Sequence, residues 1–528
     1  MDLNHPQLIQ FNPSFFFKHS SMIKNMFLGA LTITLVACSG DDSNDAVITP
    51  PTDQTNSILD SDLRTIIVEN ELTGDPSADR AIPDVEEPMA QLGMKLFFTK
   101  SLGGDFDSAC VTCHHPMLGG GDDLALPIGV DAEVVDLLGP GRLHRVDGDH
   151  FDGGPTVPRN SPTTFNVALW DDYLFHDGRV ESLGKTPKMG GEDGLGIRTP
   201  DVPFAENDDY AGDDLVVAQA RFPVTSNEEM KNFSNFGGTD NHQVRENLEQ
   251  RLGDYGDPLG GKLAVNNWLA EFREGFADPD GSAEELITFD NIAKAIGEYE
   301  SSQVFVETPW KAYVQGDDSA ISDVAKRGAK LFFGNYEDGG ANCSACHTGD
   351  FFTDEEFHVI GMAQVGRGKG DGEHGTEDFG RYRESGDEKD KYAFRTPSLI
   401  NVTATGPWGH AGASATLEQA IRTHLDPQGE LDNYDFSQLP AEVQVYDMLV
   451  NTQNAIDKLE VNRAQGISSI EHFSLSDTEI SELVAFLEAL TDPCVEDREC
   501  LSKWIPDATD SNPDSMRLDA IDSDGNYL

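Results

Sequence analysis

Apolar residues recur every three or four positions in several stretches of the chain, which is the pattern of helices with one buried face. The clearest run extends from Thr288 to Val304, where Phe289, Ile292, Ile296 and Tyr299 share one face. Stretches with the period-two alternation of a half-buried strand are sparse. The sequence therefore predicts a mainly α fold with long irregular loops.

Two further helices carry more specific signals. Ser476 and Glu479 form a capping box, in which side chains satisfy free backbone N–H groups at the start of a helix. Another helix is predicted from Thr416 to His424, with His424 on the same face as Leu417. An imidazole on a buried face needs a partner. His424 is therefore either a ligand or a core histidine bonded to backbone.

A distant repeat divides the chain into two similar parts. The segment Gly93-Met-Lys-Leu-Phe-Phe98 returns as Gly328-Ala-Lys-Leu-Phe-Phe333, and each copy is followed by a Cys-x-x-Cys-His pentapeptide. The repeating unit is predicted to be a helix, a short loop and the cysteine pair. A repeat this far apart indicates duplication of a module and not a solenoid.

The two pentapeptides are the attachment signature of c-type haem. Two thiols bond the porphyrin vinyl groups, and the adjacent histidine presents a ring nitrogen to the iron. The alternatives are a redox dithiol, which would want a preceding strand, and a four-cysteine zinc site, which leaves both histidines unexplained. The predicted haem-binding residues are Cys110, Cys113, His114, Cys343, Cys346 and His347.

The N-terminal region predicts export. Residues 1–37 contain a short basic and apolar stretch and read as a signal peptide, with a start that looks over-extended. The stretch ends in a lipobox-like Leu-Val-Ala before Cys38, which predicts lipid attachment to that thiol and a periplasmic protein anchored to a bacterial outer membrane. The alternative is an ordinary signal peptide with an incidental cysteine. Residues 38–54 are polar and predict a flexible tether.

The remaining two cysteines, Cys494 and Cys500, lie close together and are expected to form a disulfide in an oxidising compartment. The chain has 528 residues, 38% of them hydrophobic, which is enough for two or three domains with real cores. Its formal net charge of −57 excludes nucleic acid as a partner, because phosphate binding needs clustered Lys and Arg. It favours basic partners instead.

The chain resembles the bacterial di-haem cytochrome c peroxidases, which include the MauG-type enzymes. The resemblance runs from about residue 86 to residue 492. Besides the two pentapeptides, it rests on Arg159-Asn-Ser-Pro-Thr163, Phe175-His-Asp-Gly-Arg179, Phe394-Arg-Thr-Pro-Ser-Leu399 and Thr405-Gly-Pro-Trp-Gly-His410. It implies two cytochrome-c-like haem domains with calcium between them. It also implies reduction of hydrogen peroxide with electrons from a small cytochrome or copper protein, and often a homodimer.

The resemblance also implies residue roles. Glu229 would shuttle the proton while the O–O bond breaks, and Gln219 would orient the ligand. Calcium would be bound by the side-chain oxygen of Asn160 and the backbone carbonyls of Thr405 and Pro407, because calcium prefers hard oxygen ligands.

Three positions depart from the family pattern. Val130 stands where many members have a histidine that caps the first iron, so that iron is either open or bound by His144 or His150. His424, fourteen residues after His410, stands where the classical second haem has Met and the MauG-type proteins have Tyr. A bis-His haem would have a lower potential than a His/Met haem.

The third departure is His176, which stands where the family often has an inter-haem tryptophan and makes the electron route uncertain. The expected domains are 55–305 for the first, peroxidatic haem and 306–495 for the second, electron-transfer haem, followed by an acidic tail at 496–528. Residues 184–214 form an insertion of unassigned role. The leading function is peroxide reduction, and the alternatives are a MauG-type oxidase and an electron-transfer cytochrome without substrate chemistry.

Overall fold

The structure is a computed structural model that describes residues 54–468 and 470–528. The described part of the chain forms one compact unit. The predicted signal peptide, Cys38 and nearly all of the predicted tether lie outside these residues. The α-helices are α1 (Gln54–Glu69), α2 (Pro88–Phe98), α3 (Leu215–Ala220), α4 (Asn241–Gly253), α5 (Trp268–Gly275), α6 (Ala283–Leu286), α7 (Phe289–Ser301), α8 (Pro309–Val314), α9 (Asp323–Phe333), α10 (Tyr382–Ser385), α11 (Leu417–Leu425), α12 (Pro427–Asp432), α13 (Met448–Ala464), α14 (Asp477–Glu488) and α15 (Arg498–Leu501).

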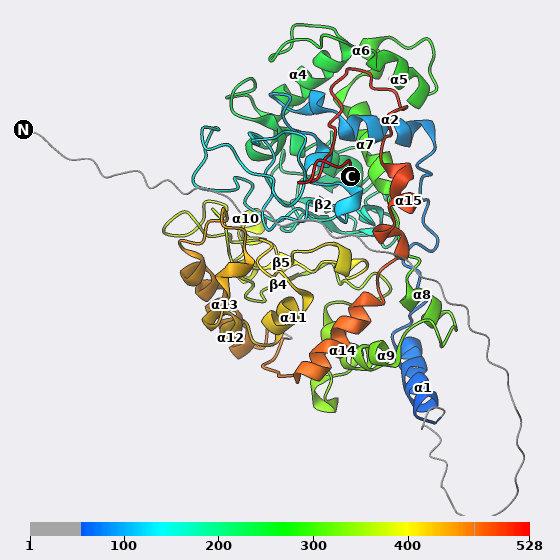
Figure 1. Cartoon of the computed structure of the whole chain (residues 1–528), viewed down its shortest axis with the longest axis vertical. Coiled ribbons are helices and arrows are strands. Elements are labelled where there is room, and N and C mark those ends of the chain that lie inside the picture. Colours follow the sequence, from blue (N-terminus) through cyan, green and yellow to red (C-terminus); the bar gives the residue numbers. More distant parts are fainter. Residues whose placement is uncertain (1–53, 469) are drawn as a thin grey trace, which may run out of the picture. The chain divides into compact units, whose positions relative to one another are not determined.

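Strands are few and short. A three-stranded antiparallel sheet has the order β1 (Tyr173–Leu174), β2 (Val180–Ser182) and β3 (Ile197–Arg198), and β4 (Phe357–His358) pairs with β5 (Phe394–Arg395). Long irregular segments connect the helices (Figure 1). The prediction of a mainly α fold is confirmed. Among the described residues, no helix has both the length and the apolar character needed to cross a membrane.

The repeated glycines are the points where the helices of each module cross. A Cβ on Gly93 of α2 would lie 1.9 Å from the carbonyl oxygen of Ala295 in α7. A Cβ on Gly328 of α9 would lie 1.9 Å from the carbonyl oxygen of Glu482 in α14. Only glycine permits so close a backbone approach. The repeat seen in the sequence is therefore a repeated helix pair, α2 with α7 and α9 with α14.

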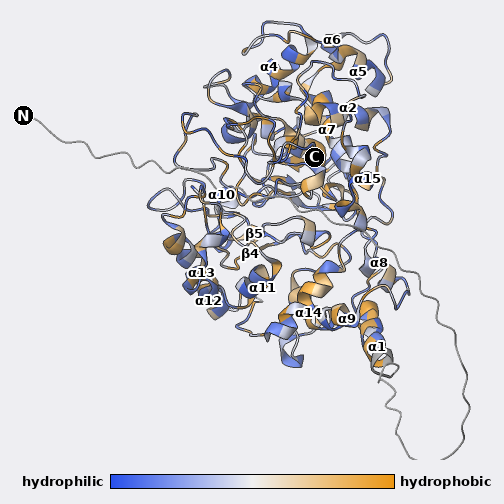
Figure 2. Ribbon diagram, in the orientation of Figure 1, coloured by the Kyte–Doolittle hydropathy of each residue, from blue (hydrophilic) through white to orange (hydrophobic). Residues whose placement is uncertain are grey.

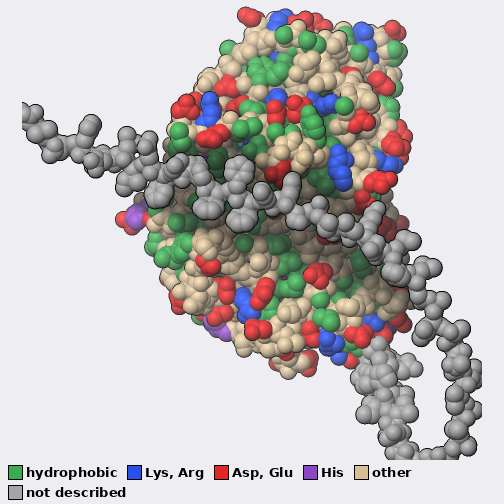
Figure 3. All heavy atoms as spheres, in the orientation of Figure 1, with side chains coloured by type: hydrophobic (Ala, Val, Ile, Leu, Met, Phe, Trp, Pro, Cys, Tyr) green, Lys and Arg blue, Asp and Glu red, His purple; other side chains and the backbone are tan. Residues whose placement is uncertain are grey.

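Two hydrophobic cores surround these pairs. The first joins α2, α4, α5 and α7, and the second joins α1, α8, α9 and α14. In Figure 1, α4, α5 and α6 lie near one end of the unit and α1, α9 and α14 near the other. The helices carry hydrophobic and hydrophilic residues together (Figure 2), as expected for helices with one buried face. Acidic side chains are spread over the face shown in Figure 3 and are not gathered into one patch.

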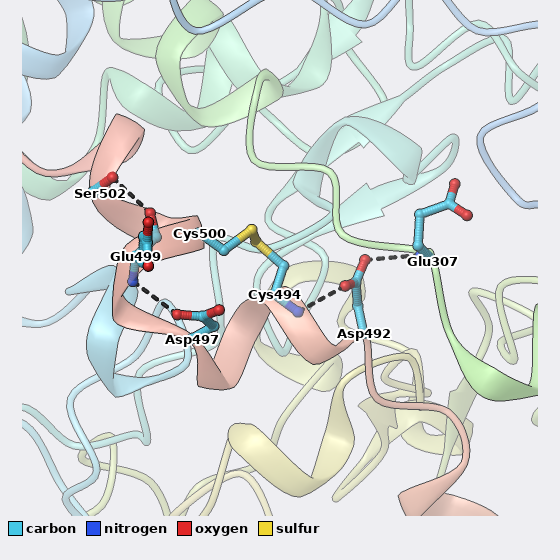
Figure 4. The surroundings of a disulfide bond; sticks show 7 residues. All are labelled: Glu307, Asp492, Cys494, Asp497, Glu499, Cys500 and Ser502. Atoms are coloured by element: carbon cyan, nitrogen blue, oxygen red, sulfur yellow. Dashed lines mark hydrogen bonds between the residues drawn. A yellow bond between two sulfur atoms is a disulfide. The ribbon is translucent and has the colours of Figure 1, made fainter.

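The C-terminal segment packs on the first core. Cys494 and Cys500 are joined by a disulfide next to Asp492, whose carboxylate accepts the backbone N–H groups of Cys494 and Glu307 at 2.9 and 2.8 Å (Figure 4). Further on, Leu518 is buried and its N–H donates to the carbonyl of Phe98 at 2.9 Å. The segment predicted as an acidic tail is thus folded against the module that carries the first cysteine pair.

Candidate haem centres and the charged cluster near the first

The first pentapeptide begins with a single 3-10 turn, Cys110–Thr112, beside the buried end of α2. The Nδ1 atom of His114 lies 3.1 Å from the carbonyl oxygen of Gly120, and burial lowers the pKa of His114 to about 4. The imidazole is therefore neutral. A neutral ring whose Nδ1–H donates to a carbonyl has an electron pair on Nε2, which is the form that ligates iron, and the Ser161 hydroxyl lies 3.4 Å from this Nε2.

The second pentapeptide repeats this arrangement. Its 3-10 turn is Cys343–Ala345, at the end of α9. The Nδ1 atom of His347 lies 3.1 Å from the carbonyl oxygen of Phe352, and burial lowers the pKa of His347 to about 4, with a contribution from neighbouring His424. Both histidines thus have a lowered pKa and an Nδ1 atom within hydrogen-bond distance of a backbone carbonyl, as a histidine that ligates haem iron through Nε2 would have.

His424 lies close enough to His347 to lower its pKa, although the two residues are far apart in the sequence. It lies on α11, and its Nδ1 atom is 2.8 Å from the carbonyl oxygen of Ala420, one turn earlier. Burial also lowers the pKa of His424. The structure therefore brings together the two imidazoles that the sequence offered as axial ligands, each with Nδ1 bonded to backbone.

The cysteines do not form a zinc site. Among the described residues, Cys346, Asp354 and His358 make up the only group of three or more candidate metal-binding side chains, so the two pairs do not meet. Burial raises the pKa of Cys343 to about 12 and raises that of Cys110 further. Zinc needs thiolates, whereas the buried neutral thiols suit thioether formation. The residues present fit covalent haem.

Glu229 lies beside the first cysteine pair. It belongs to a one-turn π-helix, Asn227–Lys231, whose backbone packs against Gly129 so closely that a Cβ there would lie 2.4 Å from the carbonyl of Glu229. The next residue, Val130, is fully buried, and its N–H donates to the carbonyl of Glu228 at 3.2 Å. The charge of Glu229 raises the pKa of the Cys113 thiol, after the larger effects of burial and of Asp122. The Gly129–Val130 backbone and the turn that carries Glu229 are therefore packed against each other.

The pKa of Glu229 is raised by burial, and the positive charges of Arg179 and Lys369 oppose that rise. Gln219, the proposed amide partner, is partly buried on α3, a helix capped by the carboxylate of Asp214. The two alternative first-haem histidines each pack on a phenylalanine. The buried ring of His144 stacks on Phe151, and the exposed His150 packs on Phe233.

The candidate calcium residues flank one loop. The amide Nδ2 of Asn160 donates to the carbonyls of Leu124 and Ala125 at 2.9 and 3.2 Å. The segment that follows Asn160 and the Ala404–Thr405 turn both pack against residues 119–121.

An ion-pair cluster absent from the sequence-based prediction joins the two modules. Arg159 pairs with Asp177 at 2.5 Å and with Asp378 at 2.6 Å, all three being buried. Arg179 contacts the second oxygen of Asp177 at 3.3 Å. The family segments included Arg159 and Asp177, but a carboxylate more than 200 residues further along the chain carries no sequence signal that would pair it with them.

His176 lies at the edge of this cluster. Its Nε2 is 3.0 Å from the carbonyl oxygen of Asn160, and burial, helped by Arg159, lowers its pKa to about 3. Trp170 lies near the second site instead: its ring meets the edge of Phe351 at 5.1 Å between centroids, and Phe351 precedes the residue that bonds His347.

Comparison with known proteins agrees with this arrangement. A family model described as di-haem cytochrome c peroxidase matches residues 87–319. The cytochrome c551 peroxidase of Pseudomonas aeruginosa is 27% identical over 338 residues, covering 64% of this chain and 71% of that protein. The methylamine utilization protein MauG of Methylorubrum extorquens is 27% identical over 364 residues, covering 69% and 76%.

The fold has a solved counterpart. A MauG-like protein associated with microbial copper homeostasis superposes with a TM-score of 0.50 at 20% identity, covering 80% of this chain and 96% of that one. Fold and site together define a di-haem c-type oxidoreductase. The chain is similar to proteins of the di-haem cytochrome c peroxidase and MauG family, and this similarity supports two c-type haems.

Proposed function

We propose that this protein reduces hydrogen peroxide to water with electrons from a small cytochrome or copper protein. The observation that carries the proposal is Glu229, a buried carboxyl group beside Cys113 whose pKa burial raises. Its proton affinity lets it take a proton from one peroxide oxygen and return it to the other as the O–O bond breaks. An electron relay would not need such a group.

The haem-binding roles follow from the local geometry. Cys110, Cys113 and His114 would hold the first haem. Cys343, Cys346 and His347 would hold the second, and His424 would be a further protein ligand to its iron. Bound haem would supply the redox iron for peroxide and for the donor. Gln219 would orient the peroxide.

The Glu229→Gln variant tests the acid–base role. It keeps the shape of the side chain and removes its titration, and we expect peroxide turnover to fall by about 10²- to 10⁴-fold. Glu228→Gln is the matched control, because Glu228 is the neighbouring carboxylate in the same turn. Both variants must bind two haem equivalents by the pyridine haemochrome assay. Unchanged turnover in Glu229→Gln would reject the assignment.

A MauG-type oxidase is the second candidate, and Val130 favours it. Valine cannot ligate iron, so Val130 would leave the iron of a haem held by Cys110, Cys113 and His114 without a ligand from this position, and such a haem would supply oxidising chemistry for a protein or organic substrate. Steady-state peroxide consumption with a reduced cytochrome separates the candidates, because an oxidase of this type would consume the donor slowly. A low-temperature EPR spectrum should show one high-spin and one low-spin iron.

We also propose that the mature protein is periplasmic and that a lipid on Cys38 anchors it to the outer membrane. Calcium would bind near Asn160, Thr405 and Pro407. The protein would form a homodimer in solution. Mass spectrometry of the mature N-terminus tests the anchor. Metal analysis of the purified protein tests the calcium. Sedimentation tests the dimer.

A further inference from the structure

The two histidines that would bind iron each face a backbone carbonyl. The Nδ1 atom of His114 lies 3.1 Å from the carbonyl oxygen of Gly120. The Nδ1 atom of His347 lies 3.1 Å from the carbonyl oxygen of Phe352. Electrons tunnel more readily through covalent bonds and hydrogen bonds than across gaps between atoms. A path for an electron between the two sites can therefore be traced from one carbonyl to the other.

The first part of this path uses only backbone. The Gly120 carbonyl that faces His114 also accepts the N–H of Thr164 at 3.0 Å. The carbonyl of Thr164 accepts the N–H of Val167 at 3.3 Å. The carbonyl of Val167 accepts the N–H of Trp170 at 3.4 Å. These backbone hydrogen bonds, the backbone arm of the path, connect the first histidine to Trp170 without following the chain residue by residue.

The second part of the path crosses two aromatic rings. The indole of Trp170 is buried and makes a T-shaped contact with the ring of Phe351, at 5.1 Å between centroids and 70° between planes. Phe351 is joined covalently to Phe352, whose carbonyl faces His347. The contact between the two rings is the one step of the path that is neither a covalent bond nor a hydrogen bond. It is therefore the step at which a substitution should matter most.

A second connection reaches Trp170 through His176. The Ser161 hydroxyl lies 3.2 Å from the Nδ1 atom of the first histidine, and the carbonyl of the adjacent Asn160 lies 3.0 Å from Nε2 of His176. The His176 carbonyl accepts the N–H of Arg395 at 2.9 Å, and the Arg395 guanidinium lies 3.3 Å from the centroid of the Trp170 ring. This connection crosses two whole side chains, so it is the longer of the two. Both connections meet at Trp170.

We propose that Trp170 and Phe351 form a bridge through which electrons pass between the two haem sites, and that the backbone arm, not His176, joins the bridge to the first site. The inference rests on the proposed function, in which electrons received at the second haem are used at the first. In the step concerned, one electron leaves the iron bound by His347 and reaches the iron bound by His114. No bond forms or breaks, and no side chain of the path is oxidised.

The test measures how fast one electron redistributes between the haems of the intact di-haem protein. A laser flash on a deazaflavin photoreductant supplies the electron, and absorbance follows a redistribution whose rate constant is independent of protein concentration. Trp170→Leu and Phe351→Leu should each lower this rate constant at least severalfold, and Trp170→Phe, which keeps a ring, should lower it less. Trp504→Leu is the matched control, because Trp504 makes a similar T-shaped contact with Phe305 at 4.9 Å but is not part of the path. It should leave the rate constant unchanged.

Both reduction potentials are measured in every variant by spectroelectrochemical titration. A fall in rate with both potentials unchanged supports the bridge, because a purely structural role would not produce it. A fall that appears only where a potential has shifted would overturn the bridge. Unchanged rates in Trp170→Leu and Phe351→Leu would overturn it as well. If Trp170→Leu does not bind two haem equivalents, Phe351→Leu breaks the same ring contact and decides alone.

His176→Leu distinguishes the two connections to the first site. An unchanged rate supports the backbone arm, whereas a fall as large as in Trp170→Leu would overturn it. The experiment contains no peroxide, so it is independent of the proposed function. A wild-type protein that redistributes the electron but does not consume peroxide would overturn the proposed function and leave the bridge in place. Full peroxide turnover together with unchanged redistribution in Trp170→Leu and Phe351→Leu would overturn the bridge alone.

Discussion

The guanidinium of Arg395 stacks on the indole of Trp170, with its Cζ atom 3.3 Å from the ring centroid. Arg395 is partly buried, and burial lowers its pKa to about 9, so it stays charged at neutral pH. One of its nitrogens donates to the carbonyl of Tyr173 at 3.0 Å. A positive charge therefore lies over the indole face of Trp170. Trp170 is the tryptophan closest in sequence to His176, which stands where the sequence comparison predicted an inter-haem tryptophan.

We predict that Arg395 prevents Trp170 from carrying a radical. A desolvated cation over an indole stabilises the neutral ring by about 2 kcal/mol and would repel the oxidised one. After treatment with peroxide, the Arg395→Met protein should show a tryptophan radical by EPR that the wild type lacks. Adding Trp170→Phe to this variant should remove the radical signal. Arg64→Met is the control, because Arg64 stacks on Tyr313 in the other core. A Trp170 radical in the wild type would contradict the prediction.

His424→Met should raise the reduction potential of the second haem, because a thioether ligand favours the reduced iron more than imidazole does. Spectroelectrochemical titration of both haems measures the change, which should appear in one of the two transitions only. The exposed His472→Met is the matched substitution and should move neither. Two unchanged potentials in His424→Met would show that His424 is a core histidine bonded to Ala420.

Asp378 should make the protein acid-sensitive. Burial raises the pKa of Asp378, but Arg159 outweighs this and holds it well below its usual range. A carboxyl group with a depressed pKa stabilises the fold fully at neutral pH, and this stabilisation is lost as the pH falls below about 4. Asp378→Asn should reduce this acid dependence and cost about 3 to 5 kcal/mol at pH 7, because Arg159 loses one of its two partners.

The measurement is the thermal midpoint between pH 7 and pH 3. Asp387→Asn serves as the control, since Asp387 lies exposed in the same segment. If Asp378→Asn followed the wild-type curve at every pH, the buried pair would not be a source of acid sensitivity.

Asp514 should anchor the C-terminal segment. Its buried carboxylate accepts the hydroxyl of Thr99 and the indole N–H of Trp268, each at 2.8 Å. Asp514→Ala leaves two buried donors without an acceptor and should cost about 2 to 4 kcal/mol. Differential scanning calorimetry should show a lower midpoint than in the wild type, and Asp524→Ala, on an exposed turn, should show none of this loss. Equal midpoints would mean that the segment contributes little to stability.

The sequence predicted what depends on local pattern. The apolar spacing from Thr288 to Val304 became α7, and the capping box at Ser476 begins α14. The repeated glycine and Leu-Phe-Phe segments became equivalent helices because helix crossing imposes the same requirement twice. These features could be found because each depends on neighbouring residues.

The charged cluster could not be predicted in the same way. Asp378 lies in the Gly- and charge-rich segment 366–391, whose composition indicates a solvated surface loop, yet it is buried and bonded to Arg159 from the first half of the chain. Likewise, the burial of Leu518 depends on contact with α2, more than 400 residues earlier. Hydrophobic periodicity contains no information on such distant partners.

Each of the two hydrophobic cores is completed by a segment from the opposite end of the chain, and this constrains when the protein can fold. Helix α1, made first, completes the core of the later module, and the last segment, around Leu501 and Leu518, completes the core of the earlier one. Neither half has its complete core until the other half has been synthesised. Assembly of the native protein must therefore wait for the whole polypeptide, and severing it between the modules would leave two incomplete halves.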